Sequence, residues 1–469
     1  MSLKVWLVAA ELNPIAKVGG LGDVIGALPK ALLKLGVDVR IITGYYGTHN
    51  ATLYPTKIIG SILIPWGKNQ ISVKVRQTNL PKSEVIVYLI DEPNIIGNGG
   101  VYDSPTAMAS GQTEIQRFLF LSKAATYLPS IIKEEPDVWH LHDWHASAIT
   151  QFLKKPHPPT LLTIHNLANQ GWAEPATLAL AGLDAQDNKD VCLFRLGLKD
   201  ANFLSTVSPN HALEIQSAPW GEGFEDILHQ RRHELVGITN GIDTEVFNPA
   251  TDPHLTTHYD VNNVSGKLTN KKQLKAEMGL ELMDVPLFSI VSRLTNQKGI
   301  ELITQIVEPL LKDHQIQFVF LGVGDPQLEQ SFNRLAQEYP GRCAGKIGFD
   351  APLAQHIYAG SDFFLMPSRF EPCGLGQLIA MRYGTIPLVR ATGGLKDTVI
   401  DMNEPGGNGL VFDEYTSDAL YKTIWRALAL YSDRARIQVV IAQAMKRDSS
   451  WDMAAQTYFN LYQNLCRAI

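Results

Sequence analysis

The sequence predicts an α/β protein built from two doubly wound domains. Strand-like apolar runs alternate with helix-like patterns in two separate series, one beginning at Lys4 and the other near Pro286. At 469 residues the chain is also too long for one ordinary domain. In each series a glycine-containing segment, Lys17–Asp23 or Ser368–Leu375, joins a strand-like run to a helix-like run. Because glycine amides at a helix N-terminus favour an anion, the two segments predict one anionic ligand held between two domains.

The first series begins with Lys4–Ala10, an apolar run typical of a central parallel strand that is covered on both faces. The apolar spacing over Leu21–Leu35 predicts a helix that ends at Gly36. A strand over Val37–Thr43 would complete a βαβ unit, the building block of a doubly wound sheet. Further strands are expected at Val85–Ile90, Val138–His142, Thr160–Ile164 and Phe203–Val207.

The second series begins with a strand over Leu287–Ser292 and a helix from Gly299. Its further strands are expected at Phe318–Gly322, Ala344–Gly348, Phe363–Pro367 and, closing the series, Ile386–Val389.

The interval between the two series, Asn248–Val285, is polar and helical, and we place the domain junction at its start. The predicted domains are therefore residues 1–247 and 248–450. The last segment, 451–469, carries apolar and aromatic residues at helical spacing, and we expect it to pack back on the first domain as a helix.

The composition excludes several classes of protein. The formal net charge is −6, from 41 lysines and arginines against 47 acidic residues, and no basic run is present. This balance disfavours general binding of nucleic acid or anionic membranes, and no apolar stretch is long enough to span a bilayer. The four cysteines are scattered without metal-binding spacing, as is typical of a reducing compartment. The first residues run directly into a strand, so we expect no signal or transit peptide and a cytoplasmic location.

The segment Lys17–Asp23 has two interpretations. Gly19 and Gly20 allow the backbone to approach a ligand closely, and Lys17 adds a positive charge. The alternative is a plain strand-to-helix turn with a lysine that faces solvent. The spacing matches neither G-x-G-x-x-G nor G-x-x-x-x-G-K-[ST], so a nicotinamide site is not favoured.

Histidines cluster at the predicted carboxyl ends of two adjacent strands, in His140–His145 and Thr163–Asn166. Ligands of open α/β sheets bind at this edge. The first cluster could ligate a metal through its histidines and Asp143, but the loop spacing is weak. We favour hydrogen bonds to a hydroxyl-rich ligand, with Trp144 as an apolar platform. A lone histidine is as often structural as catalytic, whereas two neighbouring clusters favour a site.

Charged residues also follow strands in the second series. Arg293 and Lys298 flank the start of a helix, where a guanidinium fork and an ammonium suit a pyrophosphate. Ordinary surface charge is the alternative. Glu371 is the only acid in its loop, and it would either accept sugar hydroxyls and stabilise positive charge at an anomeric carbon, or complement a helix dipole. Cys373 has no histidine beside it, so a nucleophilic role is not favoured.

Together and in this order, the motifs resemble the bacterial and plastid glycogen/starch synthase family of retaining glucosyltransferases. The resemblance runs from Lys4 to about Tyr462. It implies the GT-B fold, with two Rossmann-like domains, an active site in the interdomain cleft and a C-terminal helix that returns to the first domain. The segments that carry it are Lys17–Asp23, His142–His145, Thr163–Gln170, Thr239–Asp243, Val291–Gly299, Gly322–Pro326, Met366–Leu375, Met381–Pro387, Ala391–Val399 and Ser450–Trp451.

The resemblance also implies roles for individual residues. Catalytic roles fall to Lys17, His165, Arg293, Lys298 and Glu371. Donor binding falls to Gly19, Gly20, Asp23, Tyr102, Asp143, Asn166, Asn240, Gly324, Cys373, Gly374, Leu375, Thr392 and Gly393. Trp144 and His145 would lie on the acceptor side.

The chain departs from the family's pattern at several positions. Gly44-Tyr45-Tyr46 replaces a frequent Pro-basic-Tyr turn, Gln112-Thr113-Glu114 replaces an Asp-Asn pair, and Asn169 replaces a frequent tyrosine. By analogy these positions bear on glucan preference more than on donor chemistry. Ile379 stands where other retaining GT-B enzymes carry a second glutamate, which is similar to this family rather than to the others.

The function implied by the resemblance is transfer of glucose from a nucleoside-diphosphate glucose to the non-reducing end of an α-1,4-glucan, with retention of configuration. ADP-glucose is favoured over UDP-glucose as the donor. The chain has no Asp-x-Asp motif, so we expect neither a metal nor a cofactor, and cationic side chains would stabilise the leaving group. We expect no nucleic-acid or membrane partner, and a monomer or small homo-oligomer.

Three alternatives stay open. A catalytically silent glucan-binding paralogue would keep the fold and lose charged site residues, which are intact here. An α-glucan phosphorylase-like enzyme would need a lysine-bound pyridoxal phosphate and a much longer chain. A plastid stromal location would follow if a transit peptide had been removed.

Overall fold

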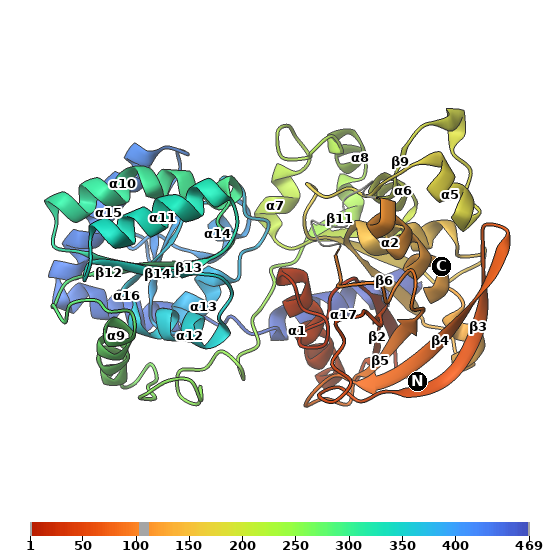
Figure 1. Ribbon diagram of the computed structural model, residues 1–469, viewed down its shortest axis with the longest axis horizontal. Helices are drawn as coiled ribbons and strands as arrows, with labels where there is room; N and C mark the ends of the chain where they lie inside the picture. Colours follow the sequence, from red (N-terminus) through yellow and green to blue (C-terminus); the bar gives the residue numbers. More distant parts are fainter. Residues whose placement is uncertain (1, 103–111, 468–469) are drawn as a thin grey trace. The chain divides into compact units, whose positions relative to one another are not determined.

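The chain forms two compact units in the computed structural model, which describes residues 2–102 and 112–467 (Figure 1). The first unit runs to Asn240 and also contains the segment that begins at Trp451. The second unit spans Gly241–Ser450. Each unit has its own sheet and its own hydrophobic core.

The first unit is built on a nine-stranded sheet with the order β11-β10-β7-β6-β1-β2-β5-β4-β3. The strands from β11 to β5 run parallel, and the β3–β4 hairpin adds two antiparallel strands at one edge. The strands are β1 Lys4–Val8, β2 Asp38–Gly44, β3 Lys57–Trp66, β4 Asn69–Asn79, β5 Ile86–Asp91, β6 Val138–His142, β7 Thr160–Ile164, β10 Phe203–Thr206 and β11 Leu235–Gly237. A separate two-stranded sheet pairs β8 Trp172–Ala173 with β9 Val191–Cys192.

The first unit has helices between its strands and one further helix from the end of the chain. They are α1 Gly20–Lys34, α2 Gln112–Ala125, α3 Leu128–Ile132, α4 Asp143–Ser147, α5 Pro175–Ala181, α6 Leu193–Asp200, α7 Pro209–Glu214, α8 Glu225–Gln230 and α17 Asp452–Arg467, with 3₁₀ turns at Ala148–Gln151, Gln186–Asn188 and Arg232–Glu234. Helix α17 returns from the far end of the sequence and packs beside α1 (Figure 1). Its buried face, which includes Ala455, Tyr458 and Tyr462, belongs to the core of the first unit.

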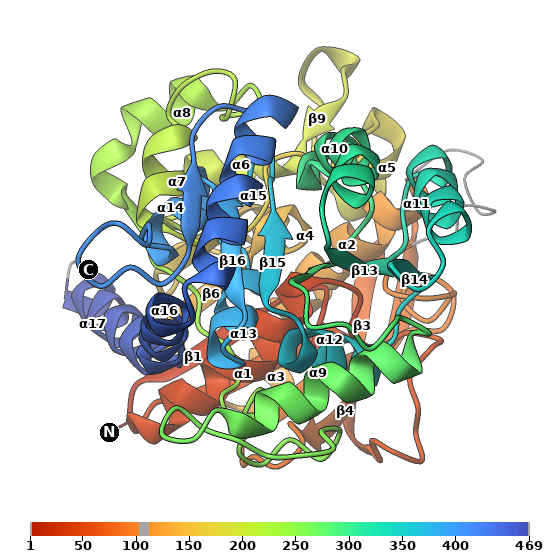
Figure 2. The ribbon, with the colours of Figure 1, turned by 90° about the vertical axis from the view of Figure 1, so that its left-hand side faces the viewer.

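The second unit is built on a six-stranded, fully parallel sheet with the order β14-β13-β12-β15-β16-β17. Strands β15 and β16 lie side by side in Figure 2. The strands are β12 Leu287–Val291, β13 Gln317–Gly322, β14 Cys343–Ile347, β15 Phe363–Met366, β16 Ile386–Arg390 and β17 Leu410–Phe412.

Helices cover both faces of the second sheet. Helices α10, α11 and α15 lie on one face, and α9, α12, α13 and α16 lie on the other (Figure 1). Buried on both sides, the strands read as nearly continuous apolar runs. The helices are α9 Ser265–Glu277, α10 Ile300–Asp313, α11 Pro326–Glu338, α12 Ala351–Gly360, α13 Gly376–Arg382, α14 Gly393–Thr398, α15 Ser417–Ser432 and α16 Arg434–Lys446, with a 3₁₀ turn at Asn296–Lys298.

Both parallel sheets share one strand order. Counted along the chain, the second sheet has the order 3-2-1-4-5-6, and the first sheet repeats that order from β5 through β10, with β11 as a seventh strand. In a doubly wound sheet the ligand crevice lies where the order reverses, outside the carboxyl ends of the strands. The reversal falls between β1 and β6 in the first unit and between β12 and β15 in the second.

The predicted strands all form, and most of their bounds shift by one or two residues. The structure corrects one prediction, because β17 and not the strand at Ile386 closes the second series. Strand β17 is a three-residue edge strand, too short for a periodic signal. The hairpin of β3 and β4 was not predicted, since Gly60 and Pro65 interrupt its first strand and much of it is exposed.

The division between the units falls after Asn240 and so precedes the expected junction at residue 248. Ile242 already belongs to the second core, and its amide donates to the carbonyl of Ser449 at 2.8 Å. The interval expected to be polar and helical contains one α-helix, α9.

Candidate active site

The carboxylate of Glu11, which was not predicted as a site residue, accepts hydrogen bonds from the glycine loop after β1. The side chain of Glu11 is 4% exposed, and its Oε2 accepts the amides of Val18, at 2.9 Å, and Gly19. The hydroxyl of Tyr102 donates to Oε1 at 2.7 Å. The Gly19 amide, expected to meet an anionic ligand, therefore binds an internal anion in this structure. The only signal for Glu11 in the sequence was its place directly after the first strand.

Lys17 and Asp23 lie together in this loop. The Nζ of Lys17 contacts Oδ1 of Asp23 at 2.7 Å, and the side-chain Nδ2 of Asn13 donates to the same oxygen at 2.9 Å. Gly20 opens helix α1, and a Cβ added to it would meet no atom within 4 Å. The first turn of α1 therefore has open space beside Gly20, with the Lys17 ammonium, about one-third exposed, in the same loop.

Asp143 and His165 meet across the ends of β6 and β7. The Oδ1 of Asp143 accepts the amides of His165 at 3.1 Å and Asn166 at 3.3 Å. Asp143 itself has a left-handed backbone with φ of 60°, a conformation that costs energy for a residue other than glycine. The Asp143 carboxylate, presented from this left-handed backbone, fixes the backbone of the second histidine cluster against the first.

The histidines and Asp143 at the ends of β6 and β7 are buried or largely shielded from solvent, which favours their neutral forms. Burial lowers the pKa of His145 and His165 to about 3 and raises the pKa of Asp143 to about 7. Burial, together with the adjacent Glu11 carboxylate, also raises the pKa of the Tyr102 hydroxyl. The ends of β6 and β7 therefore present mostly neutral hydrogen-bonding groups, whereas the loop after β1 carries the Lys17–Asp23 pair.

The two residues expected on the acceptor side, Trp144 and His145, are buried in this structure. Trp144 is 3% exposed, packs edge-on against Phe118 and covers Gly171, where a Cβ would lie 2.2 Å from the Trp144 ring. His145 is 6% exposed and lies 5.5 Å from the Tyr102 ring. Trp144 is thus part of the core here, and its role as an apolar platform for a ligand stays a prediction.

The central feature of the second unit is an ion pair across its switch point. The Nζ of Lys298, in the loop after β12, lies 2.6 Å from Oε2 of Glu371, in the loop after β15. The Ser368 hydroxyl donates to the same oxygen at 3.1 Å. The lysine side chain is 18% exposed and the glutamate side chain 6% exposed, so solvent screens this pair less than a surface pair.

Arg293 lies in the same loop as Lys298 and is exposed. Its guanidinium donates to Oε1 of Gln297 at 3.2 Å, and the carbonyl of Gln297 accepts the Arg369 amide at 2.9 Å. This links the loop after β12 to the loop that carries Glu371. Ser368 and Gln297 are therefore supporting residues that the sequence did not single out.

Two glycine-containing helix starts adjoin Glu371. The amide of Gly394 donates to the Glu371 carbonyl at 3.0 Å, and a Cβ on Gly393 would lie 2.0 Å from that carbonyl oxygen. The side-chain Nε2 of Gln377 donates to the carbonyls of Cys373 and Gly374, at 3.1 and 2.9 Å. These contacts fix the backbone over Cys373, Gly374 and Leu375 at the start of α13, and Thr392 and Gly393 at the start of α14.

Two further residues that were predicted to bind the sugar-nucleotide donor lie near the ends of strands. Gly324, after β13, donates its amide to Oε1 of Glu329 at 2.7 Å and packs against Leu294 so closely that a Cβ would lie 2.3 Å from the Leu294 carbonyl oxygen. Asn240, after β11, is 7% exposed, and its Oδ1 has no partner among the described residues.

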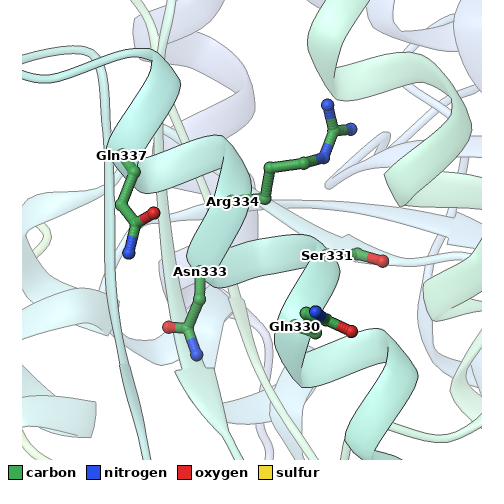
Figure 3. Close-up of a pocket in the computed structure, with 5 residues that line it drawn as sticks. All are labelled: Gln330, Ser331, Asn333, Arg334 and Gln337. Atoms are coloured by element: carbon green, nitrogen blue, oxygen red, sulfur yellow. The ribbon is translucent and has the colours of Figure 1, made fainter.

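Other features of the described residues give no competing site. Among residues 2–102 and 112–467, no group of three or more His, Cys, Asp or Glu side chains could hold a metal ion, and no helix is long and apolar enough to cross a membrane. A hollow on the surface of α11 is lined by polar side chains of that one helix (Figure 3). Its Arg334 is engaged by Glu308 and Glu338.

Comparison with known proteins identifies relatives over the full chain. The family model described as starch synthase catalytic domain matches residues 4–230, and the model described as glycosyl transferases group 1 matches residues 272–439. The glycogen synthase of Lacticaseibacillus casei (strain BL23) is 39% identical over 483 residues, covering 99% of both chains. The glycogen synthase of Streptococcus sanguinis (strain SK36) is 40% identical over 487 residues, covering 99% of this chain and 100% of the relative.

Solved structures agree with these matches. The catalytic domain of starch synthase IV from Arabidopsis thaliana, bound to ADP and acarbose, superposes with a TM-score of 0.91 at 30% identity and full coverage of both chains. A sucrose-phosphate synthase from Thermosynechococcus elongatus, with a TM-score of 0.61 at 18% identity and full coverage of both chains, shares the fold alone. With its two Rossmann-like units and relatives along its whole length, the chain belongs to the glycogen/starch synthase family of GT-B glycosyltransferases.

Proposed function

We propose that this protein transfers glucose from ADP-glucose to the non-reducing end of an α-1,4-glucan with retention of configuration. The observation that carries the proposal is the pair of Lys298 and Glu371, which brings a cation and a carboxylate together at the switch point of the second unit. The family of the chain supports glucosyl transfer, and the ADP in the structure of the Arabidopsis relative supports an adenine nucleotide donor.

The reaction breaks the bond between glucose C1 and the β-phosphate oxygen. ADP leaves with the electron pair, the acceptor 4-hydroxyl bonds to C1 on the same face, and the hydroxyl proton passes to the departing phosphate. Arg293 and Lys298 would neutralise the negative charge that develops on the diphosphate. Glu371, adjacent to Lys298, would stabilise positive charge at C1 or bind the sugar hydroxyls.

The first unit would recognise the sugar. Neutral imidazoles and amides at the ends of β6 and β7, His165 and Asn166 among them, are suited to hydroxyl groups because they donate and accept hydrogen bonds without charge. Lys17, with the open first turn of α1, would take the distal phosphate or the sugar. Glu11 would keep this loop in shape, since it bonds two of the loop's amides.

A direct assay tests the proposal. The purified chain is incubated with glycogen and either ADP-glucose or UDP-glucose, and glucose incorporation, nucleotide release and the new linkage are measured. We expect faster turnover with ADP-glucose, α-1,4 linkages and full activity after exhaustive EDTA treatment. Preference for UDP-glucose would overturn the donor assignment, and loss of activity restored by Mg²⁺ would overturn metal independence. Glycogen binding without turnover of either donor would favour the silent paralogue.

The remaining expectations stay predictions. We place the protein in the cytoplasm, as a monomer or small homo-oligomer without a cofactor. Size-exclusion chromatography with light scattering measures the oligomeric state.

A further inference from the structure

Three imidazoles lie in a row behind the predicted sugar site of the first unit, two of them fully buried and the third, that of His165, partly exposed. His140 and His142 are two residues apart on β6, so they share one face of the strand, and their ring centroids lie 4.1 Å apart. His165, at the end of the neighbouring strand β7, follows with its ring 5.3 Å from that of His142. His140 and His142 are fully buried, and burial lowers the pKa of both well below the usual range. Each ring is therefore neutral and carries one N–H.

The hydrogen-bond partners of His140 determine which nitrogen carries its proton. The Tyr462 hydroxyl of α17 lies 2.8 Å from Nδ1 of His140, and Oγ1 of Thr163 lies 2.6 Å from Nε2. Burial raises the pKa of Tyr462 well above its usual value, so its hydroxyl keeps its proton. Nδ1 of His140 is the only hydrogen-bond partner of that hydroxyl among the described residues, so the hydroxyl donates to it. Nε2–H of His140 then donates to Thr163, whose hydroxyl can donate to Ser205 at 2.6 Å.

His142 has the opposite arrangement. Its Nδ1 lies 3.0 Å from Nε2 of His165, whereas its own Nε2 is buried without a partner among the described residues. A proton on that Nε2 would be a buried donor without an acceptor, which costs about 1–3 kcal/mol. An unpaired acceptor is tolerated better than an unpaired N–H in a protein interior. The proton therefore belongs on Nδ1, and His142 donates to Nε2 of His165.

This bond determines the state of His165. Because Nε2 of His165 accepts, its single proton lies on Nδ1, the less common tautomer of free histidine. The backbone of His165 is fixed at the same time by the Asp143 carboxylate. We propose that His142 is a positioning residue that holds His165 in the Nδ1–H tautomer, with that N–H free to donate to a hydroxyl oxygen of the sugar. The identity of the sugar rests on the proposed function, whereas the tautomer does not.

The tautomer can be read directly by nuclear magnetic resonance. Protein labelled with ¹⁵N in its histidine rings gives long-range ¹H–¹⁵N spectra that distinguish the Nδ1–H and Nε2–H forms. The His165 signals are identified by their loss in His165→Asn. We expect the Nδ1–H pattern for His165 in the unaltered protein and the Nε2–H pattern in His142→Ala. An Nε2–H pattern for His165 in the unaltered protein overturns the proposal, whatever the activity of the chain.

Turnover supplies the second readout. The side-chain nitrogen of asparagine superposes on Nδ1 of histidine, so His142→Asn keeps the donor that His142→Ala removes. We expect His142→Ala to lower kcat by about tenfold or more with KM within about threefold, and His142→Asn to recover most of kcat. Equal losses in both variants overturn the proposal, because they indicate packing and not the donor.

The exposed His229 provides the control, and His229→Ala should leave both kcat and the His165 spectrum unchanged. If His142→Ala does not fold, the kinetics of His142→Asn and the spectrum of the unaltered protein still test the positioning role of His142. If the unaltered chain transfers no glucose, the proposed function fails, and the spectrum alone tests the positioning role.

Discussion

Both units carry their predicted site residues where the strand order of the sheet reverses, but the side chains at that place differ between the units. Between β1 and β6 the first unit holds buried, neutral imidazoles and a carboxylate bonded to backbone amides. Between β12 and β15 the second unit holds a lysine–glutamate ion pair. Strand order therefore decides where a site forms, and the side chains at the strand ends decide which charge it can bind. Neutral groups suit sugar hydroxyls, and the cationic loop suits a diphosphate.

We expect the first unit to unfold at a higher pH than the second when the solution is acidified. Burial lowers the pKa of His140, His142, His145 and His165, so below about pH 6.5 the unfolded chain binds protons that the folded chain does not. Stability therefore falls as the pH drops from about 6.5. Asp143 acts in the opposite direction, because its raised pKa adds stability at low pH that is lost as the pH rises through about 7.

Well below pH 6.5 the net uptake on unfolding approaches four protons on the histidines minus one on Asp143, about three in all, which corresponds to about 4 kcal/mol per pH unit. Calorimetry at pH 7.5, 6.5 and 5.5 should show a separate, earlier transition at the lowest pH. Hydrogen exchange should assign that transition to β6 and β7. Simultaneous loss of both units, or first loss of the second unit, would remove this difference between them.

Disruption of the ion pair should have the next largest effect. Lys298→Ala or Glu371→Gln removes one preorganised charge, and we expect each to cost about 2–4 kcal/mol of transition-state stabilisation. Glu371→Gln keeps the size of the side chain, so donor affinity should stay within about tenfold while kcat falls. Because the two groups are in contact, the double variant should lose less than the sum of the single losses. Steady-state kinetics on the two folded single variants and the double variant measures these losses. A near-normal kcat in either single variant would contradict the proposed role of the pair.

Glu11→Gln should loosen the glycine loop of the first unit. Glutamine has one acceptor oxygen where Glu11 uses two, so at least one buried donor loses its partner at a cost of about 1–3 kcal/mol. We expect lower unfolding free energy and a higher KM for the sugar nucleotide.

Glu92 provides a matched control for Glu11. It is 3% exposed and accepts the amides of Asn94 and Ile95 after β5, away from the switch point. Glu92→Gln should reduce stability to a similar degree and leave KM unchanged. Equal KM values in Glu11→Gln and the unaltered protein would show that the loop does not serve the donor.

Asp418→Asn should have the smallest effect. Lys422 and Asp418 lie 2.6 Å apart, the same distance as Lys298 and Glu371, but both side chains are about 70% exposed. Water screens such a pair, so we expect no measurable change in Tm or kcat. A loss comparable to that of Glu371→Gln would mean that burial and position do not distinguish the two pairs.

The sequence alone determined the two α/β series and the position of most elements. The strands β6 and β7 were predicted with their observed bounds, because each is a short apolar run that ends in polar residues. The motif residues at the ends of β1, β6, β7, β12 and β15 were also recognisable, since glycines, histidines and charges follow apolar runs there. The exposed β3–β4 hairpin and the short β17 gave no comparable signal.

Only the tertiary structure decided which of these residues meet. Glu371 lies 73 residues from Lys298, and Tyr102 lies 91 residues from Glu11, so strand order and loop path bring each pair together. Periodicity reports which face of an element is buried and carries no information about the partner on the other side. The proton positions on His140, His142 and His165 depend still further on contacts between separate strands and α17. Partner choice is a property of packing, because a buried donor takes whichever acceptor the fold places within reach.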